Sequence, residues 1–189
     1  MTDTSLISET GCWLIDDPYT TEHVFDCNLA YTLVDIFLGH TVLDLGCGFG
    51  HYVSYLRGNG ITCDGFDGNP FTVKMTRNMC SVADFSQSLS FGKAYDGVLS
   101  LEVGEHIPAQ FEKTFVDNLV RCDPKILVLS WGYPGQPGFG HVNGKAETDV
   151  ISLMLGKGFV YDAQMSQQLR QLSTFSWFKN TLFVFRKAA

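Results

Sequence analysis

A short apolar run that leads into three closely spaced glycines constrains this chain more than any other feature. The run Val42–Leu45 has the character of a buried strand, and Gly46, Gly48 and Gly50 follow it directly. Glycine has no Cβ, so its backbone can adopt a positive φ and can approach a ligand closely. The residues from His51 to Arg57 predict a helix, so the turn joins a strand end to the amino end of a helix. The sequence therefore predicts a nucleotide-type ligand pocket at this turn.

The spacing of the glycines narrows the class of ligand. A dinucleotide fingerprint would be G-x-G-x-x-G, but here the third glycine comes one residue early and His51 occupies the expected place. Asp44 stands just before the glycines, where a carboxylate would repel a pyrophosphate and attract a cation. The pattern disfavours NAD and favours a positively charged ligand such as a sulfonium.

The segment D-L-G-C-G-F-G at residues 44–50 resembles the first motif of class I S-adenosylmethionine (SAM) dependent methyltransferases. The resemblance implies SAM as the cofactor, bound through Asp44, Gly46, Gly48 and Gly50. The general likeness extends from about Gly11 to Lys187. The alternative is a glycine-rich strand-to-helix turn in some other α/β protein.

Length and composition predict one domain over residues 1–189, with an N-terminal helical lid segment at 1–39 and a core at 40–189. No apolar run approaches the roughly 20 residues that span a bilayer, and the N-terminus lacks the features of a secretory signal. Six cysteines without a C-x-x-C pair favour a reduced compartment, so we expect a cytoplasmic protein without a membrane partner. The net charge of −7 disfavours nucleic acid as a partner.

Strand and helix patterns alternate along the chain, which predicts a doubly wound α/β fold with a parallel sheet. The expected strands lie near 41–45, 62–66, 94–100 and 125–131, and the expected helices at 24–38 and near 50–58, 70–77 and 108–120. In the tail, strands at 158–161 and 181–186 flank a helix at 163–172. The family resemblance implies a mostly parallel seven-stranded, Rossmann-like sheet in which the two late strands form an antiparallel edge pair. The irregular stretch at 132–144 is expected to close over the site.

Ligands of open parallel sheets bind beyond the carboxyl ends of the strands. Asp67 ends the second predicted strand about twenty residues past the glycines, where a carboxylate can accept both ribose hydroxyls. Asp64, three residues earlier, is the competing candidate. Asp84 resembles the family's acidic residue that binds the adenine amino group, and the alternative is a turn or N-cap aspartate. Leu101 is expected to line the methionine end of the cofactor.

The predicted strand near 94–100 runs into Glu102, Glu105 and His106. The pattern E-x-x-E-H resembles a motif of metal-dependent O-methyltransferases, namely the small-RNA 3′-terminal 2′-O-methyltransferases and the ubiquinone-pathway O-methyltransferases. In those families two carboxylates, this histidine and a later histidine hold a divalent cation, and His141 is the later candidate here. The resemblance implies a metal set of Glu102, Glu105, His106 and His141 for Mg²⁺, Mn²⁺ or Fe²⁺, which would lower the pKa of a bound hydroxyl.

The alternative for this cluster is a site without metal. Glu102 would then support the cofactor, and His106 or His141 would act alone as a general base, which makes His141, His106 and Glu102 the candidate catalytic residues. Nearer the N-terminus, Trp13 and His23 are candidate substrate residues, because this family often builds its acceptor lid ahead of the sheet. Trp13 could stack on a sugar face or cover the core, and His23 could be a residue at a helix start.

These features favour a SAM-dependent O-methyltransferase that acts on a hydroxyl of a small polyol, sugar or glycan with the help of a divalent metal such as Mg or Mn. The expected partner is a small-molecule or carbohydrate acceptor. A weaker resemblance to methyltransferase domains of glycan-modifying systems implies fusion to, or association with, such enzymes. One alternative is 2′-O-methylation of an RNA end. Another is a non-catalytic SAM-binding partner subunit, which the retained acids and histidines disfavour.

Overall fold

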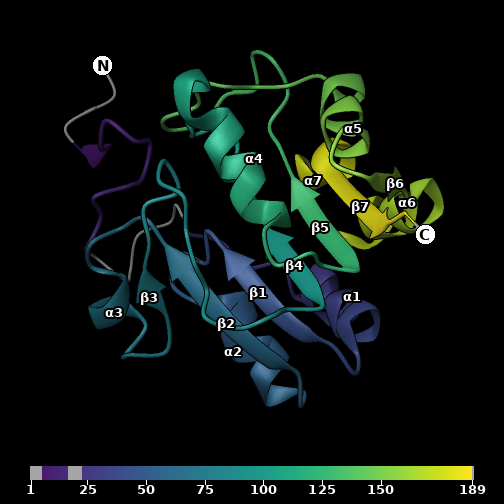
Figure 1. The fold of residues 1–189 in the computed structure, drawn as a ribbon, viewed down its shortest axis with the longest axis horizontal. Coiled ribbons are helices and arrows are strands. Elements are labelled where there is room, and N and C mark those ends of the chain that lie inside the picture. Colours follow the sequence, from purple (N-terminus) through teal and green to yellow (C-terminus); the bar gives the residue numbers. More distant parts are fainter. Residues whose placement is uncertain (1–5, 17–22, 189) are drawn as a thin grey trace.

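The computed structural model describes residues 6–16 and 23–188, and within them seven strands form one sheet covered by helices on both faces (Figure 1). The strands are β1 Thr41–Leu45, β2 Thr62–Asp67, β3 Ser81–Val82, β4 Gly97–Ser100, β5 Ile126–Ser130, β6 Phe159–Tyr161 and β7 Leu182–Lys187. The helices are α1 Cys27–Phe37, α2 His51–Gly58, α3 Thr72–Met75, η2 Ala109–Phe111, α4 Glu112–Val120, α5 Glu147–Leu155, α6 Ala163–Leu172 and α7 Phe178–Thr181.

The strand order is β3-β2-β1-β4-β5-β7-β6. The five strands from β3 to β5 run parallel, and β7 runs antiparallel to both β5 and β6. The predicted doubly wound sheet and its antiparallel C-terminal pair are therefore confirmed. The chain leaves β1 toward β2 and later returns to place β4 on the other side of β1, which makes the carboxyl end of β1 the switch point where ligands of such sheets bind.

Alternation of side chains along the strands builds a core on each face of the sheet. In β1, Val42 packs in the cluster that contains residues of α1, α2 and α6, whereas Leu43 and Leu45 pack in the cluster that contains residues of α4 and α5. In β5, Val128 and Leu129 divide between the two clusters in the same way. Since the central strands are buried on both faces, they are nearly continuous apolar runs in the sequence.

Several boundaries differ from those expected, for local reasons. Helix α1 begins at Cys27 because the Asp26 carboxylate accepts the Asn28 and Leu29 backbone amides as an N-cap. Helix α3 stops at Met75, since Arg77 and Asn78 adopt the positive φ angles of 53° and 65°. The expected strand near 94–100 begins only at Gly97.

Three elements were not expected: β3, α5 and α7. Strand β3 has two residues, both exposed, and so carries no alternating pattern. Helix α5 buries only Val150 and Met154, and α7 is a single turn. Short elements of this kind are set by the packing around them more than by their own sequence.

The N-terminal segment also differs from the expected helical lid. Helix α1 packs in the core under the sheet, while residues 6–16 form a turn closed by a bridge between Ile7 and Trp13. Residues of that turn, together with His23 and Val24, line the cavity described below, and the lid role of this segment stays a prediction. The remainder of the predicted lid, 1–5 and 17–22, lies outside the described residues. None of the described helices has the length and apolar character needed to cross a bilayer.

Candidate active site

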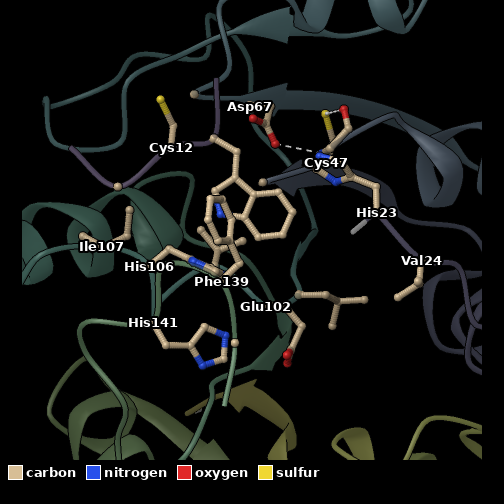
Figure 2. Close-up of a pocket in the computed structure, with 18 of the residues that line it drawn as sticks. Cys12, His23, Val24, Cys47, Asp67, Glu102, His106, Ile107, Phe139 and His141 are labelled. Carbon is tan, nitrogen blue, oxygen red and sulfur yellow. Dashed lines mark hydrogen bonds between the residues drawn. The ribbon is translucent and has the colours of Figure 1, made fainter. Parts of the chain in front are cut away.

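A cavity of about 620 Å³ opens at the carboxyl edge of the sheet, at the switch point beside β1. Its walls come from the N-terminal turn, the glycine turn after β1, the segment after β4, the long loop after β5 and the start of α7. Figure 2 separates its two ends, with Asp67 and Cys47 toward the top of the view and Glu102 and His141 toward the bottom. The volume lies within the range of ordinary small-molecule sites.

The glycine turn has the positive φ angles that its sequence predicts, 92° at Gly46 and 52° at Gly48. The protein itself, however, also requires these glycines. A Cβ on Gly46 would collide with the Val103 side chain, and a Cβ on Gly48 would lie 2.6 Å from His23 Nδ1. The sequence attributes the need for glycine here to a ligand. In the structure, Val103 and His23 also lie too close to the turn for a side chain to fit there.

Asp44 lies beneath this turn with only 2% of its surface exposed, and its Oδ2 atom has no hydrogen-bond partner. Burial raises the pKa of the Asp44 carboxyl well above its usual range, and Cys80 and Asp67 add to the effect. An unpaired buried carboxyl oxygen beside a cavity is a position that a cationic ligand would stabilise.

The structure separates Asp67 from its competitor Asp64. Asp67 lines the cavity, where its Oδ2 accepts the Gly48 amide at 2.8 Å and its Oδ1 accepts the Asn69 amide at 2.9 Å. Asp64 points elsewhere, since Lys93 Nζ, Tyr95 OH and Arg57 Nη2 bind its carboxylate at 2.6, 2.8 and 3.2 Å. The odd separation of the two residues along β2 puts them on opposite faces.

Asp84 and Leu101 both line the cavity, as expected. Asp84 also forms the turn that the alternative interpretation predicted, because its Oδ1 accepts the Ser86 amide at 2.9 Å. One side of the carboxylate is thereby used by the backbone, and the other oxygen remains available to a ligand.

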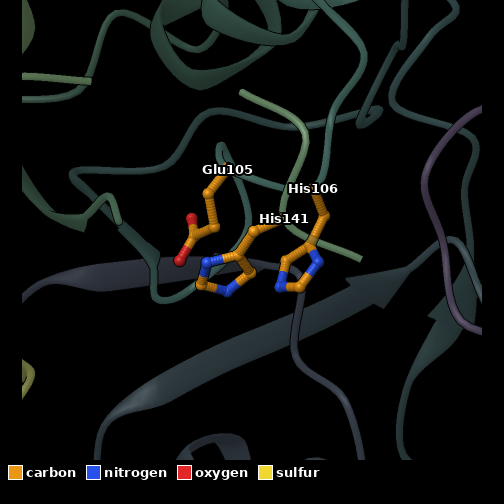
Figure 3. Close-up of side chains that lie close together, drawn as sticks. All are labelled: Glu105, His106 and His141. Carbon is orange, nitrogen blue, oxygen red and sulfur yellow. The ribbon is translucent and has the colours of Figure 1, made fainter. Parts of the chain in front are cut away.

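At the other end, Glu105, His106 and His141 come together from two loops (Figure 3). One ligand atom from each of the three lies within 4.8 Å of the others, and the two imidazole rings meet edge to face with centroids 4.9 Å apart. Glu105 is fully buried, and neither carboxyl oxygen has a hydrogen-bond partner. Buried atoms of Glu105 and His106 have no hydrogen-bond partner, and together with His141 these side chains form an arrangement that fits a divalent cation.

Burial and like charge set the protonation of this group. Burial raises the pKa of Glu105 well above its usual range, and the nearby Glu102 raises it further. Burial lowers the pKa of His106 to about 4, with His141 adding to the shift, and burial also lowers the pKa of His141. Both imidazoles are therefore neutral at pH 7, the form that accepts a proton or binds a metal. His141 Nδ1 lies 3.2 Å from the Gln136 carbonyl, which favours a proton on Nδ1 and leaves Nε2 as the free acceptor.

Glu102, the fourth predicted metal ligand, lies outside this group of three. Ser130 at the end of β5 holds it instead: the Glu102 amide donates to Ser130 Oγ at 2.6 Å, and that hydroxyl donates to Glu102 Oε1 at 2.7 Å. The pair of bonds fixes Glu102 at a φ of 55°, a conformation that costs a non-glycine residue about 1–3 kcal/mol. The predicted set of four ligands is thus a set of three with Glu102 held beside it.

Trp13 lies at the centre of an aromatic wall. Its ring meets His23, His106 and Phe139 edge to face at centroid distances of 5.0, 5.3 and 5.8 Å. The buried Trp13 Nε1 and His23 Nε2 atoms have no hydrogen-bond partners. His23 also packs on Phe49 of the glycine turn at 4.2 Å, so it lies nearer to the cofactor end than expected of a substrate residue.

Sequence reasoning missed several residues of this site. Ser130 carries no motif, and its role depends on the alignment of β5 with β4. The cavity is also lined by Tyr133, Phe139, Trp177 and Asn180. Tyr133 and Phe139 lie in the irregular stretch at 132–144, so that stretch could have pointed to them. No local sequence pattern points to Trp177 or Asn180.

Comparison with known proteins finds a matching domain family and solved structures with the same fold. The family described as methyltransferase domain matches residues 26–122. No curated protein matches the sequence. Among solved structures, magnesium protoporphyrin IX methyltransferase from Synechocystis with bound S-adenosylhomocysteine (SAH) has a TM-score of 0.64 and 20% identity, over 85% of this chain and 80% of that one.

Two further structures have the same fold. The methyltransferase domain of bacterial CtHen1-C has a TM-score of 0.58 and 17% identity, over 85% of this chain and 97% of that one. The Burkholderia thailandensis 1,6-didemethyltoxoflavin-N1-methyltransferase with bound SAH has a TM-score of 0.61 and 16% identity, over 92% and 82%. At these identities the likeness establishes the fold and leaves the acceptor open.

Proposed function

Because this chain belongs to the family of methyltransferase domains, we propose that it transfers the methyl group of SAM to a hydroxyl oxygen of a small polyol, sugar or glycan, with a divalent cation bound beside the acceptor. The observation that carries the proposal is that one cavity has acids suited to a cationic cofactor at one end and His106 and His141 at the other, with the buried Glu105 beside them. SAM supplies an electrophilic methyl carbon on a sulfonium.

At the cofactor end, Asp44 would bind the amino group of SAM through its unpaired Oδ2 atom. Asp67 would accept the ribose hydroxyls, because its carboxylate faces the cavity and is held in place by the Gly48 amide. Asp84 would accept the adenine amino group, and Leu101 would contact the methionine chain. The SAH bound in two solved structures of this fold supports the assignment of the cofactor to the glycine turn.

At the acceptor end, Glu105, His106 and His141 would hold a cation such as Mg²⁺ or Mn²⁺. The two unpaired oxygens of the buried Glu105 support this assignment, because an uncompensated buried carboxyl is costly and a metal would satisfy it. A bound cation lowers the pKa of a coordinated hydroxyl by several units, which makes an alcohol a better nucleophile.

Other residues at the acceptor end would orient the reacting groups and shield them from water. His141 Nε2 would bind the cation, while the Gln136 carbonyl accepts from Nδ1 and orients the ring. The coordinated hydroxyl, with its pKa lowered by the cation, would release its proton to solvent. Ser130 holds Glu102 at the acceptor end of the cavity. The aromatic wall around Trp13 excludes water, so that the acceptor oxygen and the methyl carbon can be held close together.

The test is transfer of labelled methyl from SAM to panels of catechols, sugars and RNA ends, in Mn²⁺ or Mg²⁺ and after chelation. We expect transfer to a diol that stops with chelator and returns with metal. Glu105→Gln, which keeps the shape and removes the charge, should abolish the thermal stabilisation by Mn²⁺, whereas the surface variant Glu147→Gln should keep it. Calorimetry that detects no SAM or SAH binding would refute the proposal.

A further inference from the structure

Trp177, the residue directly before α7, differs from the other two tryptophans of the chain in the surface that it leaves uncovered. Trp131 is buried in the core with 1% of its surface exposed, and Trp13 meets three other rings edge to face. Trp177 lines the cavity and is half-buried, and its indole is stacked on Phe175 with centroids 4.6 Å apart and 17° between the planes. Because a ring has two faces, the second face of this indole has no stacking partner among the described aromatic residues.

Buried contacts fix the position of Trp177. The Phe175 amide donates to the Asp26 carboxylate at 3.3 Å, and the Thr174 amide donates to the same oxygen at 2.7 Å. Phe178, the next residue along the chain, is buried, and its ring centroid lies 5.9 Å from that of Trp177. The indole is therefore held in place before a ligand binds, and an ordered surface loses less entropy on binding than a mobile one.

Trp177 stands at the acceptor end of the cavity. Its carbonyl oxygen accepts the hydroxyl of Thr181, which follows one helical turn later, at 3.0 Å. The Thr181 carbonyl accepts the Trp131 amide at 3.1 Å, directly after Ser130, the residue that holds Glu102. These bonds anchor α7 to the carboxyl end of β5, where Figure 1 also places it. The free face of the indole therefore belongs to the same end of the cavity as Glu102.

Two further apolar side chains of the cavity wall are exposed. Val24 and Tyr133 both line the cavity, and 44% and 45% of their surfaces are exposed. They come from the segment before α1 and from the loop after β5, so that with Trp177 three separate segments contribute open apolar surface. Apolar groups left open beside a cavity mark a binding surface. An open-chain polyol is hydrated on all sides and has no flat apolar face to cover them, whereas a ring has one.

We propose that Trp177 determines the acceptor specificity of this site, by stacking on the face of a ring that carries the reacting hydroxyl. The inference rests on the proposed methyl transfer and narrows its substrate class from polyols in general to cyclic ones. The ring would lie on the indole while its hydroxyls reach the cation, and the stack would fix which oxygen faces the methyl carbon. Aromatic rings and sugar rings share this flat face, and the acceptors below separate the two sources.

The test compares acceptors that are matched in their hydroxyls and differ in whether a ring carries them. Catechol and cis-cyclohexane-1,2-diol are compared with butane-2,3-diol, and inositol is compared with mannitol. We expect the kcat/KM of the preferred cyclic acceptor to exceed that of its open-chain match by at least about tenfold. A preference for catechol identifies an aromatic ring as the source, and a preference for inositol identifies a sugar-like ring. Equal kcat/KM values for cyclic and open-chain acceptors would overturn the inference.

Variants of Trp177 test the role of the indole itself. Trp177→Leu removes the ring face, so the kcat/KM of the cyclic acceptor should fall by about tenfold, mostly through KM, while Trp177→Phe should keep most of it. The matched control is Tyr31→Leu, which removes an exposed aromatic ring of α1 outside the cavity and should leave kcat/KM unchanged. SAH affinity, measured by calorimetry, should be the same in wild type and in Trp177→Leu. A folded Trp177→Leu protein that lost SAH affinity, or that kept the full ring preference, would overturn the inference.

The failure of this inference and that of the proposed function are distinguishable. If cyclic and open-chain acceptors are methylated alike, methyl transfer stands and only the role of Trp177 fails. If SAH binds and no acceptor is methylated, the proposed function fails. Calorimetry of catechol and inositol with the protein loaded with SAH and Mn²⁺ then decides the inference by itself: binding that weakens by about tenfold in Trp177→Leu supports the ring subsite, and binding that does not change overturns it.

Discussion

His106 and His141, which belong to separate loops, meet edge to face with ring centroids 4.9 Å apart beside the buried carboxyl of Glu105. The contact joins the segment that follows β4 to the long loop that follows β5. It places two neutral imidazoles at the end of the cavity opposite the glycine turn. The proposed chemistry depends on this contact.

Replacing His141 by alanine should leave SAM binding intact and reduce methyl transfer by at least about a hundredfold, because it removes a ligand of the proposed cation. Calorimetry with SAH and a labelled-methyl assay measure the two effects separately. His40, which does not line the cavity, provides the matched control in His40→Ala. A fully active His141→Ala enzyme would refute the assignment of the acceptor end.

Asp67→Asn should weaken SAH binding by about ten- to hundredfold, since the carboxylate faces the cavity and also anchors the Gly48 amide. The control is Asp64→Asn on the opposite face of β2, where Lys93, Tyr95 and Arg57 hold the carboxylate. That variant should bind SAH normally. If calorimetry showed the reverse pattern, the ribose role would belong to Asp64.

Ser130→Ala should release Glu102 from its left-handed conformation, because it removes both hydrogen bonds that hold the residue there. We expect kcat to fall by about tenfold with little change in SAH affinity, and stability to fall by about 1–3 kcal/mol. Ser100→Ala is the matched control at the end of β4: it loses one buried bond to the Leu45 carbonyl and leaves Glu102 untouched. Equal losses of kcat in the two variants would assign Ser130 a purely structural role.

Asp26→Asn should destabilise the fold by about 2–4 kcal/mol at pH 7, because the buried carboxylate links the start of α1 to the segment that leads to Trp177. Burial alone would raise the pKa of Asp26, but hydrogen bonds from Ser173 Oγ and from three backbone amides hold it below its usual 3.8.

The sign of the pH dependence follows from that shift. A carboxyl whose pKa is lower in the folded state stabilises the fold fully above its unfolded pKa and loses this contribution as the pH falls through its folded pKa. The stability difference between wild type and Asp26→Asn should therefore narrow below pH 3.8 in urea titrations. The surface variant Asp35→Asn should stay within about 0.5 kcal/mol of wild type at pH 7. A difference that does not change with pH would contradict the lowered pKa.

The sequence by itself determined the sheet, the glycine turn and the candidate acids. These follow from local rules: nearly continuous apolar runs mark β1 and β5, and the glycines mark the turn. Only the tertiary structure decided that His141 reaches His106, that Glu105 belongs to the metal-competent group while Glu102 does not, and that Ser130 holds Glu102. The pattern of a strand is set by residues close together in the sequence. Contacts between loops depend on how far each loop extends from the sheet edge and on what packs against it, and no local sequence pattern encodes either of these.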